Sequence, residues 1–304
     1  MSKPGKPPAS DNELHDVVVA LCDANDHLAE QLSRRRNEQP LPSRDVIVGL
    51  VEDLRAVLFP GYFGVSELSA DNMRYHVGST LDHIQRVLAE QVKRGLCFTC
   101  ELEVGEQCAD CRQRAENITH QFLQRLSHVK HLLATDVQAA YEGDPAATSP
   151  DEAIFCYPGI QAITNYRLAH ELHKLEVPLI PRIITERAHS QTGIDIHPGA
   201  RIGERFFIDH GTGVVIGETC VIGKNVRIYQ GVTLGAKSFP LDEQGNPIKG
   251  IDRHPVVEDD VIIYSGSTLL GRITVGRGSV IGGNVWLTHD VPAKSRITQA
   301  RPFE

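Results

Sequence analysis

Through its first 190 residues, this chain of 304 residues repeats its apolar positions every three to four residues, which is the period of amphipathic helices. The apolar stripes occupy residues 14–32, 47–57, 77–92 and 118–137, and two more helices are expected over 159–174 and 178–191. Pro60 ends the second stripe and Gly95 closes the third. The pattern predicts an all-helical N-terminal domain over residues 1–193, with residues 1–10 as a flexible tail.

From Ile196 onward the period of the apolar residues changes to six. The repeating aliphatic residues are Ile196, Ile202, Ile208 and Val214, then Ile216, Ile222, Ile228 and Leu234, then Val257, Ile263, Leu269, Val275, Ile281 and Leu287. Neither a helix nor a hairpin has this period, whereas in a hexapeptide repeat each hexad forms one flat face of a triangular parallel coil. The expected fold is therefore α+β, with the helical domain followed over residues 194–304 by a left-handed parallel β-helix of four to five coils.

The hexad row is interrupted over residues 235–254 by the insertion GAKSFPLDEQGNPIKGIDRH, which is rich in glycine, proline and charge. A solenoid accommodates extra residues as a loop that leaves a corner, and loops on rigid scaffolds often carry function. Stacked aliphatic side chains fill the interior of so narrow a prism, so a ligand must bind on a face or between neighbouring prisms. We therefore expect a homotrimer with its sites at the subunit junctions.

Polar segments break the aliphatic rows at three places. They are residues 195–198 at the start of the coil, residues 209–213 in its first turn and residues 252–255 at the end of the insertion. Asp195 precedes His210 by 15 residues, close to one turn of three hexads, so the two side chains should stack about 5 Å apart. An acid beside an imidazole can hold its tautomer and support it as a general base. Taken together, these segments are better candidates for catalysis than for ordinary surface corners.

The composition narrows the class of protein. A net charge of −8 argues against a nucleic-acid binder, which would present a basic face. The N-terminus has no apolar segment of the signal-peptide kind, and no stretch approaches the ~18–20 apolar residues that cross a bilayer. Seven cysteines without a signal peptide indicate a reducing compartment. We expect a cytoplasmic protein that binds neither nucleic acid nor membrane.

The motifs DIHPGARIG, DHGTGVVIGET and DRHPVVEDDV, in this order on a hexapeptide coil behind a helical region, resemble those of serine O-acetyltransferase. The segment GDPAATSPDEAIFCYPGIQAITNYRLAHEL resembles the stretch that leads into the coil in that family, so the resemblance covers roughly residues 140–295. It implies transfer of acetyl from acetyl-CoA to the hydroxyl of L-serine, which gives O-acetyl-L-serine for cysteine biosynthesis. It also implies a homotrimer or a dimer of trimers.

The same resemblance implies catalytic roles for three residues. His210 would be the general base that takes the proton of the serine hydroxyl, Asp195 its orienting carboxylate, and His254 a contact to the substrate hydroxyl. The residue types suit the chemistry, because an alcohol attacks a thioester only with a base poised near neutral pH.

Substrate binding is implied in the same way. Arg253 would bind the serine carboxylate, and Asp144 and Asp209 the ammonium group, with Asp151 as a neighbour that could replace Asp144. A zwitterion needs one cation and one or two carboxylates, which this set supplies. Candidate contacts for the pantetheine arm lie at the root of the insertion and at a later glycine pair: Gly235, Ala236, Lys237, Gly282 and Gly283.

Two features depart from the family's pattern. The loop before Asp252 is longer than expected, and the chain stops at Glu304 soon after the last hexad. Members of the family that dock into the cysteine-making sulfhydrylase do so with a longer C-terminal tail that ends in isoleucine. We therefore expect no complex of that kind.

Three other functions fit part of the pattern. A hexapeptide acyltransferase for another hydroxy-amino acid or small acceptor would share the coil and the base. A zinc hydro-lyase of the carbonic anhydrase type would use His197, His210 and His254 as ligands, which leaves Arg253 and Asp195 without a role. A non-catalytic scaffold would not release thiol from acetyl-CoA in the presence of serine.

The segment CFTCELEVGEQCADC, residues 97–111, carries two Cys-x-x-Cys pairs. The thiolates of Cys97, Cys100, Cys108 and Cys111 could close a tetrahedral zinc site, and an iron–sulfur cluster or metal-free thiols are the alternatives. Four thiolates leave no open coordination position, so a zinc ion here would be structural. We expect a clip between two helices of the N-terminal domain, about 100 residues before the catalytic segments.

Overall fold

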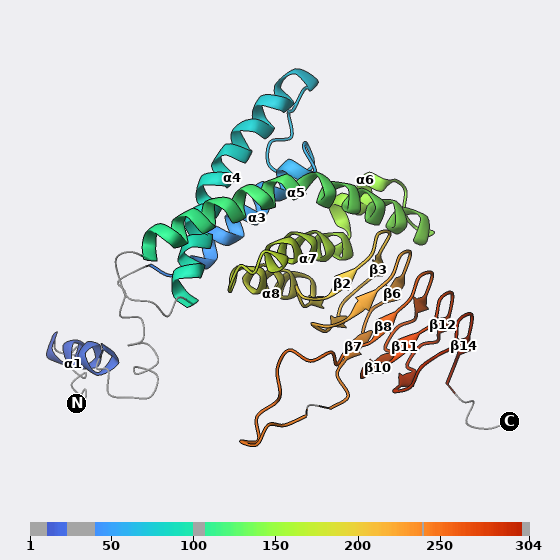
Figure 1. The fold of residues 1–304 in the computed structure, drawn as a ribbon. Coiled ribbons are helices and arrows are strands. Elements are labelled where there is room, and N and C mark those ends of the chain that lie inside the picture. The colour runs from blue at the N-terminus through green and yellow to red at the C-terminus, as the bar shows by residue number, and fades with distance from the viewer. Residues whose placement is uncertain (1–10, 23–39, 100–106, 239, 300–304) are drawn as a thin grey trace, which may run out of the picture. The chain divides into compact units, whose positions relative to one another are not determined.

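The computed structural model describes residues 11–22, 40–99, 107–238 and 240–299 (Figure 1). Its contacts divide the chain into two units, Met1–Leu41 and Pro42–Glu304. In the first unit, α1 spans Asp11–Cys22. The predicted tail and the rest of the first stripe, as far as Leu32, lie outside the described residues.

The helices of the second unit follow the apolar stripes. They are α3 (Arg44–Leu58), α4 (Ala70–Thr99), α5 (Gln107–Gly143), α6 (Pro150–Cys156), α7 (Pro158–Lys174) and α8 (Ile180–Thr192). The predicted end at Gly95 is wrong, because α4 continues through it to Thr99. Gly95 is buried there because the chain passes close by at Pro178, whose carbonyl oxygen would lie 3.1 Å from an added Cβ. The short helix α6 was not predicted.

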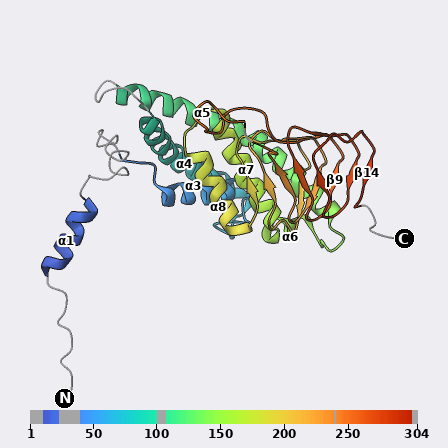
Figure 2. The same ribbon diagram turned by 90° about the horizontal axis from the view of Figure 1, so that it is seen from below.

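The hexads form short parallel strands, as predicted. They are β1 (Asp195–Ile196), β2 (Arg201–Ile202), β3 (Phe207–Asp209), β4 (Val215–Ile216), β5 (Val221–Ile222), β6 (Arg227–Tyr229), β7 (Thr233–Gly235), β8 (Val256–Val257), β9 (Ile262–Ile263), β10 (Thr268–Leu270), β11 (Thr274–Val275), β12 (Val280–Ile281), β13 (Trp286–Leu287) and β14 (Arg296–Ile297). Successive strands take the three faces of a prism in turn, with orders β1-β4-β7-β10-β13, β2-β5-β8-β11 and β3-β6-β9-β12-β14. The fold is a left-handed parallel β-helix of about five turns (Figures 1 and 2).

The aliphatic residues of the hexads point into the prism. All of them are buried except Ile202, which is partly buried and packs against the same core. The insertion leaves the coil after β7 as a long exposed loop and rejoins it before β8 (Figure 1). Within the described residues, a β-bridge between Leu241 and Pro247 and a few backbone hydrogen bonds, such as that from Ile248 N–H to the carbonyl of Pro240, hold the loop together.

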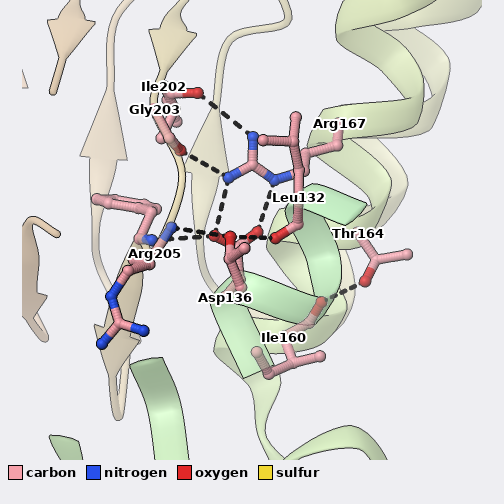
Figure 3. A network of polar contacts seen from close by, with 10 residues as sticks. Leu132, Asp136, Ile160, Thr164, Arg167, Ile202, Gly203 and Arg205 are labelled. Carbon is pink, nitrogen blue, oxygen red and sulfur yellow. Dashed lines mark hydrogen bonds and ion pairs between the residues drawn. The ribbon is translucent and has the colours of Figure 1, made fainter. Parts of the chain in front are cut away.

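The helices cover the first coil through α5, α7 and α8, which contact β1 and β3. A buried ion pair lies at this junction (Figure 3). Arg167 of α7 donates from Nε and Nη2 to the carboxylate of Asp136 on α5, at 2.6 and 2.9 Å, and the two side chains are 3% and 0% exposed. Arg167 also donates to the carbonyls of Ile202 and Gly203, and Asp136 accepts from the backbone N–H of Phe206. Helices and coil therefore share one polar network that satisfies its buried groups.

In the described ranges, no helix is both long and apolar enough to span a membrane.

Candidate functional site

The polar residues predicted to act lie at two different corners of the prism. The first group, which we call the His210 corner, consists of Asp144, Tyr157, Asp209 and His210, between the third and first faces. The second, the His254 corner, consists of His197, Glu218, Thr219, Arg253 and His254, between the first and second faces. One face of the prism, roughly six residues or at most ~20 Å of extended chain, separates the two corners of one chain.

The His210 corner holds its histidine in the open. His210 follows β3 with φ of 57°, in the left-handed region that non-glycine residues seldom occupy. Its side chain is 74% exposed, and its Nε2 lies 3.8 Å from Oδ1 of Asp209. Asp144, just after α5, accepts from the hydroxyl of Tyr157 at 2.6 Å and from the backbone N–H of Ala146 at 2.8 Å. An imidazole and two carboxylates therefore lie together at this corner.

The two carboxylates of this corner differ electrostatically. The hydrogen bond from Tyr157 lowers the pKa of Asp144, and nearby His210 and Arg227 lower it further. Burial raises the pKa of Asp209, against the opposing charge of His210. A cationic group that bound between them would gain from both anions, and it would offset the cost of burying Asp209.

The strand register does not pair Asp195 directly with His210. The parallel register pairs Asp195 with Val215, because the first coil is two residues longer than the regular coils above it, in which Val256 pairs with Thr274. The extra residues belong to the corner loop after His210, which folds back so that the N–H of Gly213 donates to the carbonyl of Gly193. The loop therefore passes beside the start of β1, and a role for Asp195 as orienting carboxylate stays a prediction.

The His254 corner is closely hydrogen-bonded. Nδ1 of His254 accepts from the backbone N–H of Thr219 at 3.1 Å and contacts the Thr219 hydroxyl at 2.9 Å. The same hydroxyl accepts from the backbone N–H groups of Arg253 and His254. The ring packs against Gly217, where an added Cβ would come within 2.2 Å of Nε2. The ring of His254, with a residue exposure of 7%, is therefore held in one orientation.

Arg253 is held by an ion pair. Its Nη2 lies 2.6 Å from Oε2 of Glu218. Burial raises the pKa of Glu218, but this hydrogen bond together with the nearby charges of His197, Arg253 and His254 outweighs it, so the pKa is lowered. Beside the pair, a groove of about 390 Å³ lies between the coil and residues 247–250 of the insertion. A guanidinium at the edge of an open groove can bind a carboxylate.

Both histidines of this corner are neutral near pH 7. Burial, followed by the charge of Arg253, lowers the pKa of His254 to about 4. Burial, followed by the charge of Arg182, lowers the pKa of His197 to about 4. Nδ1 of His197 accepts from the N–H of Gly199 at 3.0 Å, as Nδ1 of His254 does from Thr219.

The residues predicted to bind the pantetheine arm are divided between the same two corners. Gly235 ends β7, and Ala236 and Lys237 follow it on the side of the His254 corner. Lys237 packs against Gly271 of the next coil. Gly282 and Gly283 follow β12, on the side of the His210 corner.

Several residues with no predicted role take part in these corners. Glu218 and Thr219 lie in the quoted motif GET but have no catalytic signature of their own, and Tyr157 became visible only through its contact with Asp144. Arg272 donates to the carbonyls of Thr219 and His254 at 2.7 and 3.0 Å, from 18 residues beyond His254. No local sequence signal marks such partners, because the coil brings them together.

One more feature was not predicted, an aromatic pair above the His210 corner. Tyr229 pairs with Asp209 in the strand register and stacks on Tyr264, with ring centroids 5.0 Å apart. The sequence could not have indicated this pair, because the stacking of Tyr229 on Tyr264 depends on the strand register.

The cysteine segment is only partly described. Cys97 lies near the end of α4 and Cys111 near the start of α5, and these two helices pack together. Cys100 and the side chain of Cys108 lie outside the described residues. Within the described residues, no group of three or more potential ligands could hold a metal ion, so the zinc clip stays a prediction.

Known proteins resemble this chain along most of its length. Residues 254–289 match the family described as "Bacterial transferase hexapeptide (six repeats)". The Synechococcus elongatus protein "Serine acetyltransferase, plasmid" is 60% identical over 291 residues, which are 95% of this chain and 91% of that protein. The serine acetyltransferase of Bacillus licheniformis is 50% identical over 166 residues, or 55% of this chain and 73% of that protein.

Solved structures give the same picture. The serine acetyltransferase 1 of Entamoeba histolytica, crystallised with L-cysteine, matches with a TM-score of 0.71 at 39% identity and covers 82% of this chain and 85% of its own. The enzyme of Neisseria gonorrhoeae, crystallised with serine, matches with a TM-score of 0.54 at 26% identity, over 83% of this chain and 95% of its own. The similarity thus includes helices as well as coil.

Proposed function

This chain belongs to the serine acetyltransferase family, and we propose that it transfers the acetyl group of acetyl-CoA to the hydroxyl of L-serine with His210 as general base. The observation that carries the proposal is that the two corners offer complementary groups, anionic at one and cationic at the other. The His210 corner offers an exposed imidazole beside two carboxylates, and the His254 corner offers a guanidinium and a neutral imidazole. Together they match the base, ammonium site, carboxylate site and hydroxyl contact that serine requires.

In the proposed reaction, His210 takes the proton of the serine hydroxyl while the oxygen attacks the thioester carbonyl carbon. The tetrahedral intermediate then collapses with cleavage of the carbon–sulfur bond. The imidazolium of His210 returns its proton to the departing CoA sulfur, so the enzyme is restored. Asp144 and Asp209 hold the ammonium group of serine, and Arg253 holds its carboxylate. Asp195 orients His210 in this scheme.

We propose further that each site is completed by a neighbouring copy of the chain. In one chain, the His210 corner and the His254 corner lie on either side of the first face, and the residues expected to bind acetyl-CoA are divided in the same way. In a closed cyclic trimer, the His210 corner of one copy can face the His254 corner of the next, with the acetyl-CoA arm between them. A homotrimer, or a dimer of trimers, then contains three equivalent sites per ring.

Thiol release from acetyl-CoA is the direct test of the activity. The purified protein should release CoA with L-serine as acceptor, and product analysis should find O-acetyl-L-serine. Equal or faster release with another hydroxy-amino acid would reassign the acceptor. Release independent of any acceptor would contradict the proposal.

Mixing two inactive variants tests the shared site. His210→Ala and His254→Ala protein, unfolded and refolded together in equal amounts, should regain about a quarter of the wild-type activity per chain, since each site draws its two halves at random from neighbouring copies. Each variant refolded alone is the control and should stay inactive. No recovery in mixed trimers of confirmed composition would place both histidines in one chain's own site.

A further prediction of the same proposal concerns the four cysteines. Zinc bound at the four cysteines would be structural, so chelation should lower thermal stability and not the turnover of the folded enzyme.

A further inference from the structure

We propose that His254 is a neutral hydrogen-bond donor through Nε2 and not a second base, and that Thr219 is the positioning residue that fixes it in this role. The inference rests on the proposed function for its substrate, but the tautomer follows from the protein's own hydrogen bonds. It divides the work of the two histidines that the sequence presents as similar.

The tautomer of His254 follows from its hydrogen bond with a backbone N–H, a group that can donate but not accept. A backbone N–H can only donate, so the contact from Thr219 N to Nδ1 of His254 requires an unprotonated Nδ1. A neutral imidazole carries one proton, which must then be on Nε2. Within the described part of the chain, no group hydrogen-bonds to this Nε2. The ring therefore has an N–H left to give to an oxygen of the substrate.

The hydroxyl of Thr219 supports the same assignment. A hydroxyl has one proton and two lone pairs, and here the oxygen accepts from the backbone N–H groups of Arg253 and His254 at 2.9 and 3.2 Å. Its proton is left for Nδ1 of His254, at 2.9 Å. One threonine therefore holds both the ring and the backbone at the point where the insertion rejoins the coil.

Other contacts keep the ring neutral and in place. Burial and the neighbouring guanidinium of Arg253 lower the pKa of His254, so the imidazolium is disfavoured. Arg272 joins the two segments of this corner by donating to the carbonyls of Thr219 and His254. Gly217 leaves room for the ring, since a Cβ at this position would meet Cδ2 of His254 at 2.0 Å. The corner is thus built before substrate arrives.

An Nε2–H can donate to the serine oxygen or to the oxyanion of the tetrahedral intermediate, but it cannot take the hydroxyl proton. His210 is then the single base of the reaction. This assignment predicts an asymmetry between amide substitutes, because the glutamine amide can place an N–H near the position of Nε2, whereas the shorter asparagine amide reaches only that of Nδ1.

The experiment compares His254→Gln with His254→Asn in the full-length protein. His254→Gln should keep kcat within about tenfold of wild type, whereas His254→Asn should lose about 10²–10³-fold, as for a removed oxyanion donor. The low-pH limb of kcat/KM should be the same in wild type and His254→Gln, because the base is unchanged. Equal losses in both variants, or a shifted low-pH limb in His254→Gln, would overturn the donor role.

Thr219 is tested by its own pair of variants. Thr219→Val should lower kcat about tenfold with little change in KM, because it removes one of the two donors to Nδ1, and Thr219→Ser should restore it. Thr80→Val, the same change at a part-buried threonine of α4, is the matched control and should leave kcat unchanged. An unaltered kcat in Thr219→Val would contradict the positioning role.

A spectroscopic readout separates this inference from the proposed function. Solid-state ¹⁵N spectra of histidine-labelled protein, with His254→Gln for assignment, should show Nδ1 of His254 unprotonated and Nε2 protonated at pH 7.5. If serine acetylation failed while this signature was found, the proposed substrate would be wrong and the tautomer right. A protonated Nδ1 would overturn the inference whatever the activity.

Discussion

Each of the two corners of the coil carries a histidine that we expect to act on the substrate, but the two corners differ in how tightly they hold it. At the His210 corner, the histidine is 74% exposed and its Nε2 lies 3.8 Å from Oδ1 of Asp209. At the His254 corner, the histidine is buried and its Nδ1 is engaged twice by Thr219. A base must reach its substrate and exchange its proton, whereas a fixed donor works best when its orientation is settled beforehand. The contrast indicates a division between proton transfer and preorganised binding.

The sharpest way to break the comparison is to remove the exposed histidine. His210→Ala should lower kcat about 10²–10⁴-fold while leaving the free energy of unfolding unchanged, because an imidazole that is 74% exposed makes little packing contact. Steady-state kinetics and urea denaturation on the same preparations measure both. His289→Ala, a change at another exposed histidine, should affect neither. A large loss of stability in His210→Ala would mean that the corner is held together by this side chain.

Changing the buried ion pair of Arg167 and Asp136 tests whether the helices stabilise the His210 corner more than the His254 corner. Arg167→Met should destabilise the protein by about 3–5 kcal/mol, because it leaves Asp136 charged, buried and unpaired. Urea denaturation measures the loss. Arg86→Met, which removes an exposed pair with Asp82, should be close to neutral.

A second variant separates the lost charge from the lost packing. Asp136→Asn combined with Arg167→Met should recover part of the stability, because the buried charge is gone. Asp136 binds the backbone of Phe206, just before β3, which leads to the His210 corner. Arg167→Met alone should therefore lower kcat but leave the ¹⁵N signature of His254 unchanged. Equal disturbance of both corners would contradict the comparison.

At the His210 corner, the phenol of Tyr157 is the partner whose removal is most informative. Tyr157→Phe removes the hydrogen bond that contributes most to the lowered pKa of Asp144, so the pKa should rise towards its usual value. KM for serine should rise about three- to tenfold, with a smaller change in kcat, because the carboxylate loses an anchor and still keeps its charge at neutral pH. Tyr141→Phe, at an exposed tyrosine of α5, is the control. A change in kcat alone would argue against an ammonium site at Asp144.

The smallest expected effect is on the pH dependence of stability. The folded-state pKa of His197 and of His254 is about 4, against an ordinary value of 6.5. Between these values the unfolded chain binds more protons, so the free energy of unfolding is full above pH 6.5 and falls as pH drops towards 4. Urea denaturation from pH 7.5 to 5 should show a shallower fall in His254→Gln than in wild type. An identical slope would mean that His254 titrates normally in the folded protein.

Much of the fold was accessible from the sequence because its signals are local. Aliphatic residues that recur every six positions predict the coil, and apolar residues that recur every 3.6 positions predict the helices before it. Neither signal depends on the rest of the chain. Gly95 is the instructive failure. A glycine after an apolar stripe usually ends a helix, but here it lies inside α4 to let Pro178 approach. Its meaning depended on a residue far away in sequence.

The candidate site could be predicted from the sequence only in part. The sequence alone determined which residue types are available: His210 beside Asp209, and Arg253 beside His254. It also determined the insertion that ends at Arg253 and His254. Only the tertiary structure decided how they are grouped, because a coil of unequal turns places each residue at a corner by its register and not by its spacing. The tautomer of His254 was likewise decided by Thr219, 35 residues earlier, through a backbone N–H that every sequence contains and only the fold can aim.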